Sequence, residues 1–105
     1  MENLSLHHEA RSRAGGTQQI AIIGIVASGN LEVLVERVMP NSECQVVIKT
    51  PVEGFSAVWT AVVADFVERH SPGGLRFSIN DGGAGPDVVS LRLTQATRLM
   101  QGNKS

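Results

Sequence analysis

The first candidate for chemistry in this sequence is a hydroxyl group in a predicted turn. Ser28 is followed by Gly29 and Asn30, and apolar segments stand on both sides. Glycine and asparagine tolerate the positive backbone φ angles that tight hairpin turns require. The sequence therefore predicts a β-hairpin with Ser28 exposed at its tip. A serine in such a place is nearly always only a turn residue, and it rarely has a special role.

The second candidate is the glycine-rich stretch from Asp81 to Gly85. It joins a predicted strand to a predicted helix, a position where backbone N–H groups can bind a phosphate. Glycines between a strand and a helix are more commonly turn residues. This loop supports an alternative function for the chain, that of a small-ligand or regulatory binding domain.

The remaining reactive side chains have simpler interpretations. Cys44 is the single cysteine and alternates with its neighbours as in a strand, so we interpret it as a small buried apolar residue. His70 stands near the end of a predicted helix, where it can interact with the helix dipole. Asp65 and Glu68 are interpreted as solvated carboxylates of the same helix.

We predict no metal site and no catalytic residues. His7 and His8 are adjacent in a polar segment and lack a partner ligand at a useful spacing. Motifs of paired cysteines, zinc hydrolases, serine hydrolases and phosphate-binding loops are also missing from the sequence.

Composition and charge exclude two classes of partner. The chain has 105 residues, a net charge of −1 and scattered Lys and Arg residues, which argues against nucleic-acid binding. The longest apolar run, around residues 20–27, is far shorter than the ~20 residues that cross a bilayer. The polar N-terminus does not resemble a signal peptide, and we expect a cytoplasmic protein without a membrane partner.

Hydrophobic periodicity predicts one domain over residues 17–102, with a flexible N-terminal tail at 1–16 and a C-terminal tail at 103–105. Residues 17–27 are apolar on both alternating faces, which is typical of a central strand. Helices would cover one face of this strand and a partner protein could cover the other. The chain could accordingly be a structural subunit that docks through this strand.

The other predicted elements follow in order along the chain. We expect strands at 31–38, 44–49 and 75–80, a helix that ends before Ser71, and a helix over 86–101. The first helix could begin with a capping box at Thr50 or with a cap at Ser56, and a strand is also possible over Val89–Leu93. The order β-β-β-α-β-α favours an α+β fold with a mainly antiparallel four-stranded sheet and two helices on one face.

Four segments together resemble a known family. They are GIVASGNLEVLVE (24–36), VVIKTPVEG (46–54), LRFSINDGGAGP (75–86) and VVSLRLTQA (88–96). The chain resembles, from about residue 17 to residue 100, the acyl-carrier (delta) subunit of malonate decarboxylase, and more distantly the carrier (gamma) subunit of citrate lyase. The Ser-Gly turn before an acidic and apolar strand is the most specific part of this resemblance. This chain has Asn30 where the family has aspartate, and asparagine suits the turn equally well.

The resemblance implies a non-catalytic carrier with a covalent prosthetic group. In the family, the serine of the Ser-Gly turn carries 2'-(5''-phosphoribosyl)-3'-dephospho-CoA through a phosphodiester, and Ser28 is the matching position, with Gly29 and Asn30 beside it. The thiol of this arm would carry an acetyl group that is exchanged for malonyl and regenerated with release of carbon dioxide. The implied partners are the acyl transferase and decarboxylase subunits and the prosthetic-group transferase.

Overall fold

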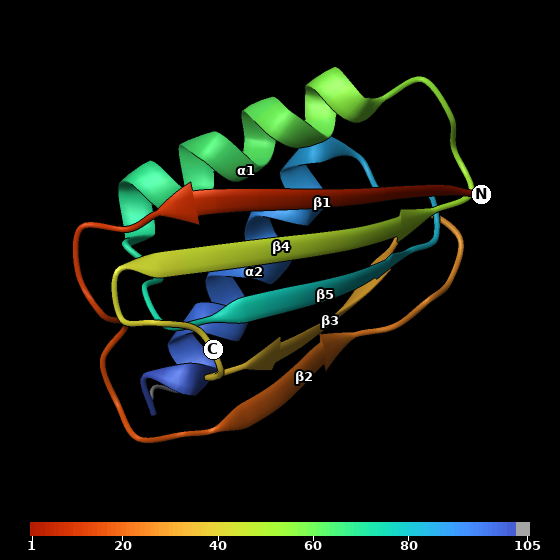
Figure 1. Ribbon diagram of the computed structural model, residues 1–105. Helices are drawn as coiled ribbons and strands as arrows, with labels where there is room; N and C mark the ends of the chain where they lie inside the picture. Colours follow the sequence, from red (N-terminus) through yellow and green to blue (C-terminus); the bar gives the residue numbers. More distant parts are fainter. Residues whose placement is uncertain (103–105) are drawn as a thin grey trace.

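Five strands and two helices make up the fold of the computed structural model, which describes residues 1–102 (Figure 1). The elements are β1 (Glu2–Glu9), β2 (Ile20–Gly24), β3 (Leu31–Glu36), β4 (Glu43–Thr50), α1 (Ser56–His70), β5 (Arg76–Asp81) and α2 (Pro86–Met100). The predicted C-terminal tail at 103–105 lies outside the described residues.

The sheet is mixed and has the strand order β1-β4-β5-β3-β2. The pair β4 and β5 is parallel, whereas the other three pairs are antiparallel. The prediction of an α+β fold is confirmed, but that of a mainly antiparallel four-stranded sheet is wrong. Because α1 crosses over between β4 and β5, the chain returns to the same end of the sheet and enters β5 in the direction of β4.

The additional strand is β1, in the segment predicted as a flexible tail. It pairs with β4 along its whole length, from Glu2 opposite Thr50 to Glu9 opposite Glu43. Its alternate side chains are half-buried and exposed. The tail prediction is therefore wrong for Glu2–Glu9. Only Leu4 and Leu6 are apolar in this strand, which is too weak a signal for periodicity, and pairing of the backbone with β4 determines the structure.

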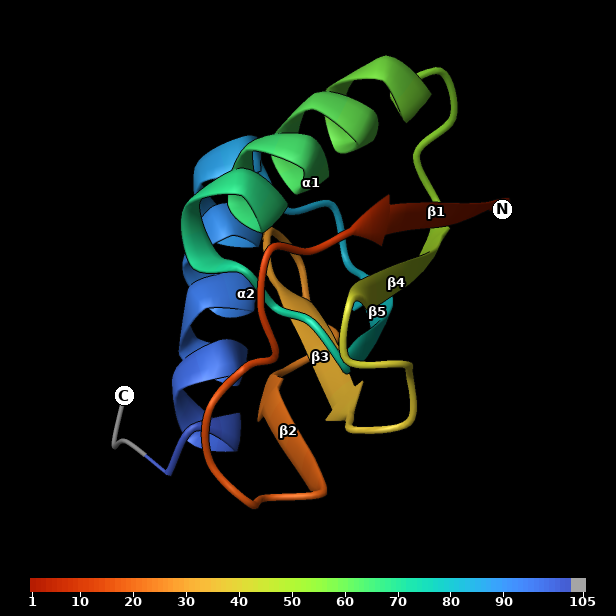
Figure 2. The same ribbon diagram turned by 60° about the vertical axis from the view of Figure 1, so that its left-hand side comes forward.

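Both helices pack on the same face of the sheet, as predicted (Figure 2). Alternate residues of the three inner strands point into the core beneath them. The fully buried core side chains include Leu31, Val33, Val35, Val46, Ile48, Phe77, Ile79 and Leu93. Phe66 of α1 contacts Phe77 of β5 edge to face, with the ring centroids 5.4 Å apart. The alternation of apolar and polar residues in β3, β4 and β5 thus arises because one face of each strand is buried in the core.

The helix boundaries test the alternatives left open by the sequence. Helix α1 begins at Ser56, and its N-cap is Phe55, which makes no side-chain capping hydrogen bond. Neither the capping box at Thr50, which is the last residue of β4, nor a cap at Ser56 is therefore formed. Helix α2 begins with Pro86 and continues through residues 89–93, which excludes a strand there. A proline in the first helical turn costs no hydrogen bond, since its N–H would have no partner inside the helix.

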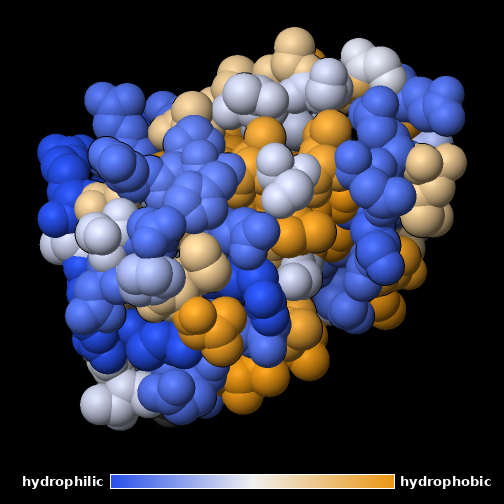
Figure 3. Space-filling model, in the orientation of Figure 1, coloured by the Kyte–Doolittle hydropathy of each residue, from blue (hydrophilic) through white to orange (hydrophobic). Residues whose placement is uncertain are grey.

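Strand β2 lies at an edge of the sheet, so the prediction of a central strand over 17–27 is wrong. It is short, from Ile20 to Gly24, and pairs only with β3. Ile20 and Ile22 are exposed on the sheet face away from the helices. Hydrophobic residues accordingly form a patch in the lower middle of Figure 3, over β2. Among the described helices, none is long and apolar enough to cross a membrane.

Candidate functional site

Ser28 lies in an exposed turn of the loop between β2 and β3, which comprises residues 25–30 and is called the serine loop below. Asn30 N donates a hydrogen bond to Ala27 O at 2.9 Å, and this bond closes a β-turn with Ser28 and Gly29 at its centre. Gly29 has a φ of 74° and Ser28 does not have a positive φ, which identifies a type II turn. The predicted turn is confirmed, although only Gly29, and not Asn30, needs a positive φ.

The glycine loop, residues 81–85, supports the serine loop from behind. Gly29 N donates to Gly82 O at 3.0 Å, and Gly82 N donates to Asn30 O at 2.8 Å. A side chain at Gly82 would not fit, because an added Cβ would lie 2.2 Å from Ala27 O. The pairing of β3 with β5, which places Leu31 opposite Asp81, brings the two loops together. The two candidates found separately in the sequence therefore form one structural unit.

Asn30 holds the base of the serine loop through its side chain. Its Oδ1 accepts a hydrogen bond from Leu31 N at 2.8 Å and another from Arg92 Nε at 3.2 Å. Arg92 comes from α2, and it also donates to Gln95 on the next turn of that helix at 2.9 Å. Asn30 thus connects the serine loop to α2 and fixes where β3 begins.

The Ser28 hydroxyl is accessible to another protein, but the residues around it do not activate it. In the described part of the chain, the side-chain hydrogen bonds of the serine loop come from Asn30 and leave this hydroxyl free. An added Cβ at Gly29 would have no heavy atom within 4 Å, so the backbone beside Ser28 is open to approach. A serine without a base is a poor nucleophile by itself. The arrangement is able to accept a group, but it does not activate the serine.

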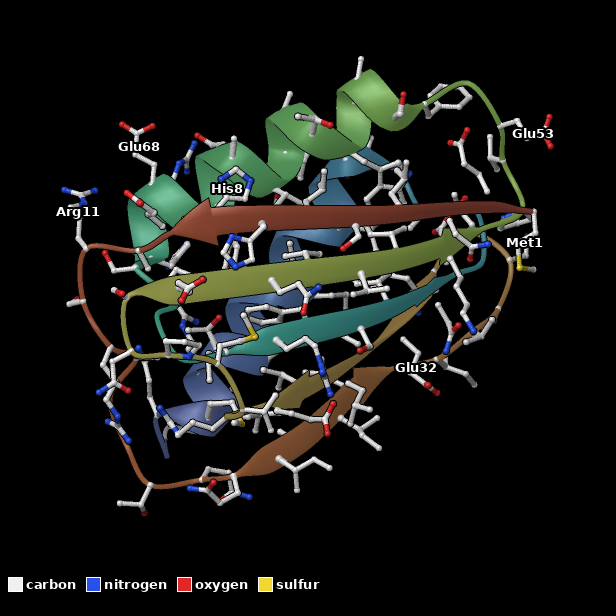
Figure 4. The ribbon with its side chains drawn as sticks, in the orientation of Figure 1. Met1, His8, Arg11, Glu32, Glu53 and Glu68 are labelled. Carbon is white, nitrogen blue, oxygen red and sulfur yellow. The ribbon has the colours of Figure 1, made fainter. Side chains whose placement is uncertain are left out.

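Charged groups of both signs lie at the end of the molecule that carries the serine loop. Glu32 and Glu53 project there together with the N-terminal Met1, whereas His8, Arg11 and Glu68 lie at the opposite end (Figure 4). The guanidinium of Arg92 adds a positive charge beside the serine loop, where it is bonded to Asn30.

The glycine loop is not arranged to bind a phosphate. Gly82 N is bonded to Asn30 O, and Ala84 N donates to Asp81 Oδ1 at 2.8 Å, so two of its N–H groups have partners. Asp81 is buried, with 7% of its surface exposed, and its Oδ2 accepts a hydrogen bond from Thr50 at 2.8 Å. A carboxylate in this loop repels an anionic ligand. Gly82 serves the close approach of the serine loop instead.

The other reactive side chains lie away from Ser28. His70 is at the C-terminal end of α1, beside Phe66 and 3.4 Å from Thr94 Oγ1. Burial and the nearby Arg69 and Arg98 lower the pKa of His70, so it is mainly neutral at pH 7. Because α1 runs away from the serine loop, this histidine and Ser28 lie at opposite ends of the molecule (Figure 1).

Cys44 and the acidic residues of α1 have structural roles. Cys44 is fully buried in β4, and burial raises the pKa of its thiol to about 12, which keeps it unreactive. Asp65 forms an exposed i,i+4 ion pair with Arg69, and Glu68 is exposed on the same helix, as expected of solvated carboxylates. His7 Nε2 lies 2.8 Å from Glu43 Oε1 across β1 and β4. Among residues 1–102, no group of three or more potential metal ligands comes together.

Reasoning from the sequence missed two residues that shape the site. Gly82 was visible only as one glycine of a loop, and its contact with Ala27 arises from strand pairing. Arg92 carried no sequence signal at all, since it is one polar residue on a helix. Both act through contacts between segments that are distant in the sequence.

Comparison with known proteins identifies relatives over nearly the whole chain. The family model of the malonate decarboxylase delta subunit (MdcD) matches residues 18–100. The malonate decarboxylase acyl carrier protein of Bradyrhizobium diazoefficiens is 65% identical, with 98% of each chain covered. The protein of the same description from Xanthomonas campestris pv. campestris is 49% identical, with 97% of each chain covered.

A solved structure has the same fold. A chain in the crystal structure of a Pseudomonas malonate decarboxylase hetero-tetramer in complex with malonate superposes with a TM-score of 0.83. The two chains are 33% identical, and the alignment covers 95% of this chain and 99% of the other.

Proposed function

Because this chain belongs to the malonate decarboxylase delta subunit family and is an acyl carrier subunit of malonate decarboxylase, we propose that Ser28 is the attachment residue of its prosthetic group. An acyl carrier protein is a non-catalytic subunit that works with a prosthetic group. The group we propose is 2'-(5''-phosphoribosyl)-3'-dephospho-CoA, joined to the Ser28 oxygen by a phosphodiester. The observation that supports this assignment best is the exposed type II turn, which the glycine loop holds from its inner side while Ser28 and Gly29 stay open on the outer side.

The residues around Ser28 fit such a group. The hydroxyl is free, the backbone at Gly29 is open, and the glycine loop and Asn30 hold the turn without covering it. A rigid turn offers the serine to the transferase in one geometry, which reduces the conformational entropy that is lost on binding. The transferase would supply the base that Ser28 lacks.

When attached, the group supplies a thiol on which acyl groups are carried as thioesters. The protein's part is to present the attachment point and to allow the thiol to reach other subunits. A thioester carbonyl delocalises the charge that decarboxylation of a malonyl group leaves, and the partner subunits must stabilise that charge. This division of roles agrees with the lack of a base at Ser28.

The partners we propose are the acyl transferase and decarboxylase subunits, together with the prosthetic-group transferase. The structural relative is part of a hetero-tetramer, and we propose a comparable assembly for this chain. We place it in the cytoplasm. The exposed apolar residues Ile25 and Val26, which precede Ser28 in the serine loop, are suited to contacts in such an assembly.

Intact mass spectrometry tests the attachment site. The chain, produced together with its modifying enzymes, is expected to gain the mass of one phosphoribosyl-dephospho-CoA group. Ser28→Ala should abolish this gain and all decarboxylase activity of the complex. Ser42→Ala is the matched control, because Ser42 is also exposed in a turn between two strands. This variant keeps Ser28 and should gain the full mass of the group.

Two outcomes would contradict the assignment. One is an unmodified native chain in an active complex, and the other is a mass gain that persists in Ser28→Ala. The same experiment decides against the alternative functions, since a structural subunit predicts that Ser28→Ala leaves the activity of the complex intact. A ligand-binding regulatory domain predicts an unmodified Ser28.

A further inference from the structure

A cavity of about 270 Å³ lies beside the glycine loop. It is bounded by the N-terminal parts of α1 and α2, the end of β4 and the glycine loop itself. Apolar side chains dominate its lining, among them Val52, Phe55, Val58, Trp59, Val62 and Val89. Phe55, Val52 and Val58 are also partly exposed at 50%, 38% and 40%, so the apolar lining reaches the surface.

The glycine loop separates this cavity from the serine loop by a single segment of chain. Gly82 makes backbone hydrogen bonds to both Gly29 and Asn30, while residues 83–85 line the cavity. The ends of β4 and β5 and the beginnings of both helices lie at the same end of the molecule as the serine loop (Figure 1). An arm that starts at Ser28 thus has only the glycine loop to cross.

Size and polarity restrict what the cavity can hold. Its volume is slightly below the ~300–1,000 Å³ that is typical of sites for drug-sized ligands, so a narrow chain suits it better than a nucleotide. The polar part of the wall is the pair Thr50 and Asp81, whose side chains are bonded to each other. Within residues 1–102, Asp81 forms no ion pair with a basic side chain.

We infer that this cavity is a resting site for the neutral end of the arm on Ser28, the free thiol or its acetyl thioester, and this inference depends on the proposed function. An acetyl thioester is small and uncharged and fits the valine and aromatic lining. A malonyl thioester carries a carboxylate, which would lose its hydration and approach the carboxylate of Asp81, which no basic side chain neutralises within residues 1–102. The acetyl form is held on the carrier, and the malonyl form remains outside for the decarboxylase.

The test compares cleavage of the thioester by hydroxylamine on the modified carrier and on CoA. The acetyl carrier should react at least fivefold more slowly than acetyl-CoA, and the malonyl carrier within twofold of malonyl-CoA. Mass spectrometry follows the loss of the acyl group. Cys44 does not capture that group, because its thiol is buried and its pKa is raised to about 12, so the measurement reports on the arm alone.

Variants connect the protection to the cavity. Val58→Trp fills the cavity from α1. It should raise the rate at which hydroxylamine cleaves the acetyl thioester of the carrier to the rate measured for acetyl-CoA. Val52→Trp fills it from the loop before α1 and serves as a second variant if the first is unstable. Leu91→Trp is the control, because Leu91 is 51% exposed on α2 and does not line the cavity, and it should keep the protection.

Acetyl carrier that reacts as fast as acetyl-CoA would overturn the inference, and so would equal protection of the acetyl and malonyl forms. Protection that survives in both Val58→Trp and Val52→Trp would also overturn it. The mass of the starting material separates these failures from a failure of the proposed function, since a chain without the arm on Ser28 refutes the attachment itself.

Discussion

Two irregular segments at opposite ends of the molecule are fixed in different ways. The serine loop is held by backbone hydrogen bonds to Gly82 and by Asn30. The segment 10–19, between β1 and β2, makes backbone hydrogen bonds to Ser42 and Gly73 and is bound in addition by the side chain of Arg37, called the arginine clamp here. Its guanidinium donates to four backbone oxygens, those of Ala14 (2.7 Å), Gly15 (2.9 Å), Gln18 (2.9 Å) and Met100 (3.0 Å).

The difference follows from what each end must leave uncovered. A long cationic side chain can collect several carbonyl groups, but it occupies the surface over the segment that it binds. Bonds from the glycine loop reach the serine loop from its inner side and leave Ser28 and Gly29 open. The contrast indicates that the serine loop is built for access and the segment 10–19 for stability.

Gly82→Ala should have the largest effect, because the added methyl group would meet Ala27 O at 2.2 Å and Asn30 O at 2.9 Å. We expect the free energy of unfolding to fall by about 3 kcal/mol and modification of Ser28 to slow at least tenfold. Urea unfolding and intact mass measure the two effects. Gly15→Ala, with no atom near its added Cβ, is the control. Normal modification of Gly82→Ala would show that the glycine loop does not position the serine loop.

Arg37→Met should destabilise the fold without affecting Ser28. Loss of the clamp leaves carbonyl groups without their charged donor, and we expect a fall of about 2 kcal/mol in the free energy of unfolding. The control is Arg98→Met, since Arg98 is exposed. This substitution should change the free energy of unfolding by less than about 0.5 kcal/mol. The rate of modification of folded protein should equal that of the wild type. A slower rate would mean that the two ends are coupled.

Gly29→Ala separates backbone strain from steric contact within the serine loop. An added Cβ meets nothing within 4 Å, but the φ of 74° is unfavourable for alanine. The free energy of unfolding should fall by about 1 kcal/mol, and modification should slow less than in Gly82→Ala. Equal losses in the two variants would refute the distinction between strain and contact.

His70 predicts a small pH dependence at the end of the molecule away from Ser28. Burial, Arg69 and Arg98 lower its pKa in the folded state below the ordinary value of 6.5. The unfolded chain then binds a proton more readily, so stability falls as the pH drops through 6.5 and stops falling below the folded pKa. His70→Gln should flatten this part of a urea-midpoint profile between pH 7.5 and 5. An unchanged profile would assign the dependence to other groups.

Local patterns predicted the elements that have one buried face. The alternation in β3 and β5 and the helical spacing in α2 each reflect contact with a single core. Strand β1 was missed because its backbone pairing with β4 leaves little trace in its mostly polar side chains. The parallel pair was missed because the order of elements along a chain does not determine which strands are neighbours.

The same limit applies to the candidate site. The turn at Ser28 was predictable from Gly29, because a positive φ is a local property. Its support by Gly82 was not, since β3 and β5 must pair before the two loops meet. The assignment of Ser28 itself came from the family resemblance, and it stays a prediction until the mass of the modified chain is measured.

The central position of β5 in the sheet has a consequence for synthesis of the protein. β5 is the last strand to be made, yet it joins β4 to β3 and so connects the two outer pairs of strands. While the chain emerges from the ribosome, β1 with β4 and β2 with β3 can form only separate two-stranded pairs, which are marginally stable alone. Cooperative folding must wait until Asp81 has left the exit tunnel, and the helix that covers β2 and β3 follows later still.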